Sequence, residues 1–373
     1  MELTDRFPGG NIRVLSRREN TFDLAPDPRD SLGGSFYWAF RADGRPGETL
    51  TVRFDAPWVG FLGPAVSRDG SHYGWLGRRE SDFSFTYTFA PGETRVWFAH
   101  HLLYLPERFL GFAAGLGLPV GELCRTRSGA AIPFTRFGMG DTRILLTARH
   151  HAAESPGSYV LEGALAELAE RPSPHLTVFC VPFVDYEGVL AGDPGKNRQP
   201  HDHNRDYNPL VPAIFDEVGA IRAIIDHWGF RLGADFHSPW HRGAQNDLVF
   251  IPQKSHAKAG RLTRFGRVLE EEMTEDALPY AQKNDLPPDT LWNREGSPSL
   301  ATYLNRSVGN DLAATLEVPF FGTPDCPVTE NALLALGRCV GRAIRRWIET
   351  EPPPATPQKP PRTAPWSDAD GSY

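Results

Sequence analysis

Hydrophobic and polar positions alternate over the first hundred or so residues, which predicts strands rather than helices. The stretches 36–54 and 81–99 each have the pattern strand, turn, strand, with glycine and proline in the turns. In the second stretch, four aromatic residues alternate with small polar ones, as in a strand with one buried face: Phe83, Phe85, Tyr87 and Phe89. Short strands at this spacing predict an antiparallel β-sandwich.

The pattern changes at about residue 106, where a short helix ending in glycine is predicted at 106–117. Beyond it, near-continuous apolar runs alternate with amphipathic stretches. The predicted strands are 143–148, 176–184, 230–236 and 313–321. The predicted helices are 159–170, 212–229, 258–277 and 331–350. Apolar strands separated by helices predict a mixed, largely parallel sheet covered on both faces.

The chain therefore divides into three predicted regions of an α/β protein. Residues 1–116 form the β-sandwich, and residues 117–350 form an α/β/α domain. The tail 351–373 has seven prolines in 23 residues and few apolar groups, so it is predicted to be disordered.

Composition narrows the possible partners and compartment. The net charge of −7 disfavours nucleic acid or an anionic membrane as a partner. No apolar run approaches the roughly 18 residues of a membrane span. The four cysteines are widely spaced, so neither a disulfide framework nor a thiolate zinc site is predicted. We expect a cytoplasmic protein with reduced thiols, and the sequence leaves its oligomeric state open.

Polar residues with metal-binding chemistry lie at the ends of the predicted parallel strands. His151 and Glu154 follow the first strand, His237 follows the third, and Glu317 lies in the fourth. In an open α/β sheet the ligand crevice lies at the carboxyl ends of the strands. Two histidines and a glutamate with an open fourth position are typical of a catalytic zinc site. A carboxylate in an apolar strand needs a partner, and Glu317 is the candidate base.

Other histidines leave alternatives open. His241 lies four residues after His237 and could be the ligand in its place. His201 and His203 flank Asp202 and could form a separate metal cluster. His72, His100 and His101 are expected to be structural. His150 is expected to pack against its neighbours or to meet solvent.

Several segments resemble motifs of zinc carboxypeptidases of the funnelin (M14) family. The segments that carry the resemblance, in the family's order, are LTARHHAAES, DYEGVLAG, DHNRDY, FHSPW and TLEVPFFG. FYWAF is similar to a sandwich strand of the family's cytosolic carboxypeptidase group. The resemblance covers nearly the whole chain apart from the tail. It implies a carboxypeptidase-like catalytic domain after the sandwich, with one Zn²⁺ per chain and peptide or protein C-termini as substrates.

The resemblance also implies roles for individual residues. His151, Glu154 and His237 would be zinc ligands, with Glu317 as general acid and base for a zinc-activated water. A second set would act on substrate or support the ligands. Asn204 and Arg205 would grip the terminal carboxylate, Arg198 would stabilise the oxyanion, and Asp202 would hold the second ring nitrogen of His151. Tyr303 and Arg306 are the candidate substrate-binding tyrosine and specificity residue.

One departure from the family pattern lies between the first two ligands, where Ala152 and Ala153 replace the usual proline and glycine. Two alternative functions also remain. One keeps the zinc site for deacylation of N-acyl amino acids or small amides, as in the succinylglutamate desuccinylase and aspartoacylase branch. The other is a catalytically silent binding protein. The sandwich and the DHNRD motif favour the peptidase over the deacylase, and the complete ligand set with Glu317 argues against a silent scaffold.

Overall fold

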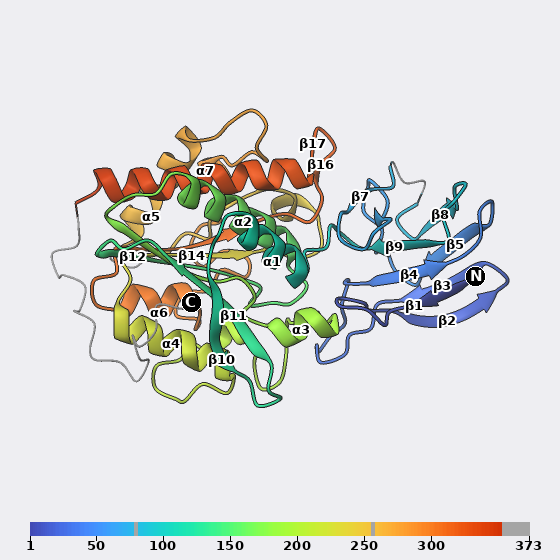
Figure 1. Cartoon of the computed structure of the whole chain (residues 1–373), viewed down its shortest axis with the longest axis horizontal. Coiled ribbons are helices and arrows are strands. Elements are labelled where there is room, and N and C mark those ends of the chain that lie inside the picture. Colours follow the sequence, from blue (N-terminus) through green and yellow to red (C-terminus); the bar gives the residue numbers. More distant parts are fainter. Residues whose placement is uncertain (78–80, 255–257, 353–373) are drawn as a thin grey trace.

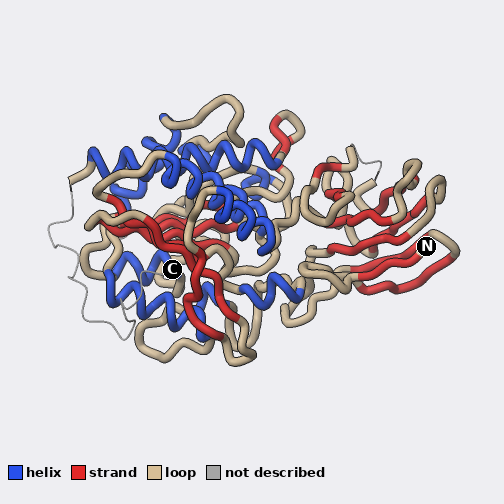
Figure 2. Tube along the Cα trace, viewed as in Figure 1, coloured by secondary structure: helices blue, strands red, loops and turns tan. Residues whose placement is uncertain are grey.

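The computed structural model describes residues 1–77, 81–254 and 258–352, and two units lie side by side along its long axis (Figure 1). The N-terminal unit consists almost entirely of strands and loops, whereas the second contains a central sheet between helices (Figure 2). This α/β architecture confirms the predicted fold class. Most of the predicted disordered tail, from residue 353, lies outside the described residues.

The N-terminal unit is a sandwich of two sheets. The first has the order β1 (Glu2–Thr4), β4 (Ala39–Asp43), β9 (Arg95–Ala99), β6 (Ala65–Ser67), β7 (Gly74–Trp75). The second has the order β2 (Arg13–Arg18), β3 (Thr21–Ala25), β5 (Thr49–Phe54), β8 (Ser84–Thr88). The pairing is antiparallel as predicted, except that β3 and β5 run parallel.

The two predicted strand–turn–strand stretches each pass from one sheet to the other. β4 and β5 lie in opposite sheets, and so do β8 and β9. The alternating aromatic residues of the second stretch point into the core between the sheets, where Phe85, Tyr87 and Phe89 are buried against Trp38 and its neighbours. The prediction was wrong for Phe83, which precedes β8 and is 49% exposed.

The second unit is built on a six-stranded mixed sheet. Its order is β10 (Val120–Arg125), β11 (Ala131–Phe137), β13 (Leu176–Val181), β12 (Thr142–Ala148), β14 (Leu232–His237), β15 (Leu312–Glu317). The last four of these strands are parallel, and β10 and β11 form an antiparallel hairpin at one edge. A small hairpin follows the sheet, formed by β16 (Gly322–Thr323) and β17 (Cys326–Pro327).

Helices cover both faces of this sheet (Figure 1) because successive side chains of a buried strand point to opposite sides. Ile144 and Leu146 of β12 pack in one apolar cluster, and Leu145 packs in the other. The first cluster includes α1 (Pro106–Gly115), α2 (Ser155–Glu170), α5 (Ala259–Glu271) and α7 (Glu330–Thr350). The second includes α4 (Asp216–Trp228) and α6 (Leu300–Arg306). In the described residues no helix has the length and apolarity of a membrane span.

The shorter helices lie in the connections: α3 (Tyr186–Ala191), η1 (His203–Arg205), η2 (Ala244–Asp247) and η3 (Gln282–Asn284). Two glycines explain how the long helices α2 and α7 come together. A Cβ atom on Gly163 would lie 2.1 Å from the carbonyl oxygen of Leu334, and one on Gly337 would lie 2.2 Å from that of Val160. Only glycine permits this approach.

The two units contact each other through several loops. The Asn11 side chain donates to the Gly192 carbonyl at 2.8 Å, and the Trp75 indole donates to the Val328 carbonyl at 2.6 Å. The helix α1, on the N-terminal side of the predicted boundary at 116/117, packs on α2, where Arg108 pairs with Glu162 at 3.0 Å. The position of that boundary stays a prediction.

Candidate metal centre

The parallel strands bring the predicted ligands to one edge of the sheet. His237 and Glu317 are the last residues of β14 and β15 and stand opposite each other in register. His151 comes three residues after β12, and Glu154 precedes α2. The turn between them is closed by a hydrogen bond from the Glu154 amide to the His151 carbonyl at 3.1 Å. The Ala152–Ala153 pair therefore keeps both side chains on one side.

These side chains converge closely. The Nδ1 atom of His151 lies 2.8 Å from Oε1 of Glu154, and Nδ1 of His237 lies 2.8 Å from Oε2 of the same carboxylate. One ligand atom from each residue lies within 4.8 Å of the others. All three side chains are buried, at 8%, 1% and 2% exposure for His151, Glu154 and His237.

Each of the two histidines has a second carboxylate behind it. Nε2 of His237 lies 2.7 Å from Asp235, and Nε2 of His151 lies 3.6 Å from Asp202. A carboxylate at Nε2 can hold a proton on that nitrogen, which would leave the Nδ1 lone pair for an ion bound between the rings and Glu154. Two lone pairs and a carboxylate that face one another form a favourable arrangement only around a cation or extra protons. This donor set, two imidazoles and one carboxylate, fits a catalytic zinc ion.

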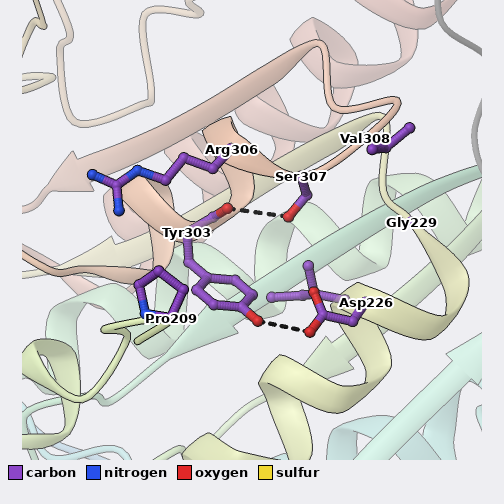
Figure 3. Close-up of a pocket in the computed structure, with 8 residues that line it drawn as sticks. Pro209, Asp226, Gly229, Tyr303, Arg306, Ser307 and Val308 are labelled. Carbon is purple, nitrogen blue, oxygen red and sulfur yellow. Dashed lines mark hydrogen bonds between the residues drawn. The ribbon is translucent and has the colours of Figure 1, made fainter. Parts of the chain in front are cut away.

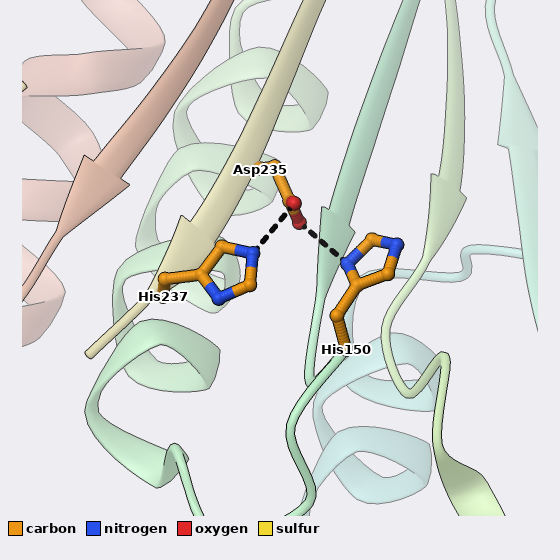
Figure 4. Close-up of side chains that lie close together, drawn as sticks. All are labelled: His150, Asp235 and His237. Atoms are coloured by element: carbon orange, nitrogen blue, oxygen red, sulfur yellow. Dashed lines mark hydrogen bonds and ion pairs between the residues drawn. The ribbon is translucent and has the colours of Figure 1, made fainter. Parts of the chain in front are cut away.

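Asp235 joins a second group of side chains with metal-binding chemistry, shown in Figure 4. Its Oδ1 atom accepts from Thr147 at 2.7 Å and contacts Nδ1 of His150 at 2.9 Å, while Oδ2 contacts His237. Nε2 of His150 lies 2.8 Å from the Tyr207 hydroxyl, and His150 is fully buried. Each oxygen of Asp235 thus already has a donor, and its contact with Nε2 orients the His237 ring.

The local charges shift the pKa values of the centre in opposite directions. Burial lowers the pKa of His237, but Asp235 and Glu154 outweigh it and raise this pKa well above its ordinary value. Burial would raise the pKa of Glu154, but His151, Lys196 and His237 hold it well below its usual range.

Glu317 is the exception among the carboxyl groups. It is 6% exposed, and burial raises its pKa to about 7. Its backbone also pairs with Phe250, which fixes the end of β15. A carboxyl group with a pKa near neutrality can both accept and return a proton under ordinary conditions. Glu317 therefore has the chemistry expected of a general base beside the convergent ligands.

A lysine that the sequence patterns did not single out also reaches this centre. Nζ of Lys196 lies 2.5 Å from Oε1 of Glu154 and donates to the carbonyls of Ser238 at 2.9 Å and Pro239 at 3.3 Å. Lys196 lies in a loop without periodicity, between two of the motifs, so neither spacing nor hydrophobic pattern could have identified it. Only the fold brings it to Glu154.

The short helix η1 presents three of the predicted residues beside the ligands. The Asp202 side chain caps η1 by accepting from the Arg205 amide at 3.2 Å. Nδ2 of Asn204 lies 3.4 Å from the His237 ring, and its Oδ1 accepts from the Leu300 amide at 3.3 Å. Arg205 is exposed, with one guanidinium nitrogen donating to the Pro298 carbonyl at 3.2 Å. Asp202 and Asn204 thus lie close to the two histidines, and Arg205 is next to Asn204 on η1.

Arg198 is engaged elsewhere. Its guanidinium pairs with Asp185 at 2.6 Å, with Asp193 at 3.2 Å and with Asp30 of the sandwich. It also lies 2.9 Å from the His203 ring. These contacts occupy most of its N–H groups, and none of them joins the convergent ligands. An oxyanion role for Arg198 stays a prediction that its present contacts do not favour.

The His201 and His203 pair forms no metal group within the described residues. His203 stacks on Phe215, with ring centroids 3.7 Å apart, and lies 2.6 Å from Glu217. His201 pairs with Asp206 at 2.9 Å. Hydrogen bonds of this kind are an ordinary structural use of histidine.

Tyr303 and Arg306 line a different cavity, of about 200 Å³, shown in Figure 3. The Tyr303 hydroxyl donates to Asp226 at 2.8 Å. Gly229 and Val308, which also line this cavity, precede β14 and β15. The cavity therefore lies towards the amino ends of strands whose carboxyl ends carry the candidate metal centre. This placement gives no support to their predicted contact with substrate.

Comparisons with known proteins agree with this architecture. No protein-family model matches the chain. A protein of Zymomonas mobilis, ZMO1242, whose function is uncharacterized, is 23% identical over 355 residues, covering 88% of this chain and 90% of that protein. A metallo-carboxypeptidase from Burkholderia cenocepacia superposes with a TM-score of 0.77 at 19% identity, over 94% of this chain and 99% of that one.

A metallo-carboxypeptidase from Pseudomonas aeruginosa, solved in complex with (2-guanidinoethylmercapto)succinic acid, superposes with a TM-score of 0.75. Its identity to this chain is 19%, over 94% of this chain and 99% of that one. Both superpositions include the sandwich as well as the α/β/α unit, because they cover nearly the whole chain. The chain thus has the two-part fold of these metallo-carboxypeptidases, as the sequence motifs predicted.

Proposed function

We propose that this protein is a zinc-dependent metallocarboxypeptidase that removes C-terminal residues from peptides or proteins. The observation that carries the proposal is the convergence of His151, Glu154 and His237 at a strand edge where Glu317 ends the adjacent strand. Asn204 and Arg205 lie beside it on one short helix. The metallo-carboxypeptidases that share the fold add support.

Each residue has a role that follows from its chemistry. Nδ1 of both histidines and the Glu154 carboxylate would hold the zinc ion, which when bound supplies Lewis-acid activation of water and of the scissile carbonyl. Glu317 would take the proton of the attacking water and pass it to the leaving amine, for which a pKa of about 7 is suitable. The exposed guanidinium of Arg205 would form charge-assisted bonds with the substrate's terminal carboxylate. Asn204 would add a neutral donor beside it.

The proposal is tested by incubating the full chain with a peptide library and reading the products by mass spectrometry, with and without a metal chelator. We expect loss of single C-terminal residues, abolished by the chelator and restored by added Zn²⁺. Hydrolysis of N-acyl amino acids is measured in the same assay, which distinguishes a peptidase from the alternative, a deacylase. Cleavage of these compounds without cleavage of peptides would contradict the proposal.

Glu317→Gln provides the matched test of mechanism. Removal of a general base lowers the rate by about two to four orders of magnitude, while the zinc content is unchanged because Glu317 is not a ligand. Glu349→Gln, at an exposed position near the end of α7, serves as the control and keeps parental activity. Full peptidase turnover in Glu317→Gln would show that the general base lies elsewhere.

A further inference from the structure

The ammonium group of Lys196 lies in the candidate metal centre, beside Glu154. An ammonium has three N–H donors, and three acceptors surround this one: Oε1 of Glu154 and the carbonyls of Ser238 and Pro239. The side chain is 22% exposed, so most of it is shielded from water. The positive charge is therefore fixed in place against a carboxylate that is also the proposed zinc ligand.

Glu154 has backbone contacts that hold it in addition to Lys196. Its other oxygen, Oε2, accepts from the Ser238 amide at 3.1 Å. The Glu154 amide also bonds to the His151 carbonyl at 3.1 Å, which holds the turn. Because these backbone contacts orient the carboxylate, the main contribution of Lys196 at 2.5 Å from Oε1 is its charge.

That charge has two opposed consequences. A cation bound to Glu154 lies close to the Lys196 ammonium, and two like charges a few ångströms apart in a buried site repel strongly. The same positive charge lies near the end of β15, because the Ser238 and Pro239 carbonyls that accept from it directly follow His237, which stands opposite Glu317 in register. Negative charge that develops on a substrate carbonyl at this place is stabilised by a fixed cation.

We propose that Lys196 is a charge-balancing residue of the metal centre, which lowers the affinity for the divalent ion and supplies positive potential where the oxyanion develops. Arg198 is paired with three carboxylates and is poorly placed for that second role. The metal-affinity half of this inference is independent of the reaction. The kinetic half rests on the proposed peptidase function.

The alternative role for Lys196 is that of a brace, and the two roles predict opposite changes in metal affinity. If Lys196 chiefly positions Glu154, removing it disorders a ligand and weakens zinc binding. If it chiefly contributes charge, removing it relieves repulsion and tightens zinc binding. Tighter zinc binding after removal of Lys196 is therefore the result that a purely structural role does not produce.

The experiment uses the full chain, stripped of metal and titrated with Zn²⁺ against a chromophoric chelator. Lys196→Met should bind zinc at least about tenfold more tightly than the parent, while Lys196→Arg, which keeps the charge, stays within about threefold. Lys283→Met, at an exposed position on η3, is the control for a lost lysine and should match the parent. Unchanged or weaker zinc binding in Lys196→Met overturns the inference.

Two further measurements keep the test decisive. Lys196→Gln is a second neutral variant that retains an N–H donor, and it should tighten zinc binding as well if Lys196→Met folds poorly. With zinc at saturation, kcat/KM on a cleaved peptide should fall at least about tenfold in either neutral variant and recover in Lys196→Arg. Tighter zinc with unchanged kcat/KM overturns the catalytic half. If no peptide is cleaved by the parent, the zinc titration still decides the metal half.

Discussion

Two groups of buried histidines in this protein have opposite protonation chemistry. In the candidate metal centre, His151 and His237 lie between carboxylates. Burial lowers the pKa of each histidine, but Glu154 and the aspartates outweigh it, so that both pKa values are raised. In the contact between the two units, His100, His101 and His241 lie among aromatic rings. There burial dominates and lowers the pKa of His101 to about 3. Burial is common to both groups, so the partners decide the charge.

The contact histidines form an ordered row. Nε2 of His241 donates to the Pro57 carbonyl at 3.1 Å, so its Nδ1 accepts from Nε2 of His100 at 2.8 Å. Nδ1 of His100 then accepts from Nδ1 of His101 at 2.9 Å. With these directions His241 and His100 are neutral, and a proton added to the accepting nitrogen of either ring would place two donors against each other. These histidines therefore join the sandwich to the second unit, in contrast to His151 and His237, whose Nδ1 atoms face Glu154.

The comparison is tested most strongly by substituting one histidine from each group. His237→Gln removes an Nδ1 ligand and should reduce zinc affinity by more than the roughly 10- to 100-fold seen when only outer partners are lost. Peptidase activity should fall with it. His241→Gln should keep zinc stoichiometry, because His241 contacts His100 and Pro57 rather than the ligands. Metal analysis of the two purified variants measures the zinc content of each. Loss of zinc from both variants would contradict the assignment of different roles to the two groups of histidines.

A smaller effect is expected from the carboxylate behind the ligand ring. Asp235→Asn keeps the shape of the side chain but removes the charge that holds the proton on Nε2 of His237. Zinc affinity should fall about 10- to 100-fold, the usual cost of losing such a partner. The chelator competition assay measures it. The matched control is Asp226→Asn, whose carboxylate bonds to Tyr303 at the opposite edge of the sheet. Equal losses in both variants would indicate general destabilisation.

The smallest predicted effect is on how the free energy of unfolding depends on pH. The pKa of His100 is lowered by burial and by the neighbouring His241, His101 and Arg242, and Arg149 adds to burial in lowering that of His101. In the unfolded chain these histidines titrate near about 6.5, so the unfolded state binds more protons below that pH. Stability is therefore present at higher pH and lost on acidification, by up to about 1.4 kcal/mol per pH unit for each such histidine.

Urea unfolding at about pH 7.5 and pH 5.5 checks this slope. His100→Gln keeps a donor and an acceptor but cannot be protonated in this range, so its free energy of unfolding should fall less on acidification than that of the parent. The metal-centre histidines, whose pKa values are raised, contribute with the opposite sign in both proteins and cancel in the difference. An identical slope in parent and variant would mean that His100 does not remain neutral in the folded state.

Much of the architecture could be predicted because its signals are local. The apolar run at 143–148 and the amphipathic stretch at 159–170 became β12 and α2, since strand and helix periods depend on neighbouring residues. The three-residue spacing of His151 and Glu154 likewise places both side chains on one side of a single turn. The hairpin β10–β11 and the short helix α6 lack such periodicity and were not predicted.

The sequence by itself determined most of the long helices and buried strands, their order and the chemical types at the strand ends, because these follow from patterns within a few residues. Tertiary structure alone decided the partners. It directed Arg198 to three carboxylates, joined His241 to His100, and brought Lys196 against Glu154. Such pairs join segments far apart in the chain, and which donor meets which acceptor depends on how whole elements pack. That dependence has no trace in the local pattern of hydrophobic and polar residues.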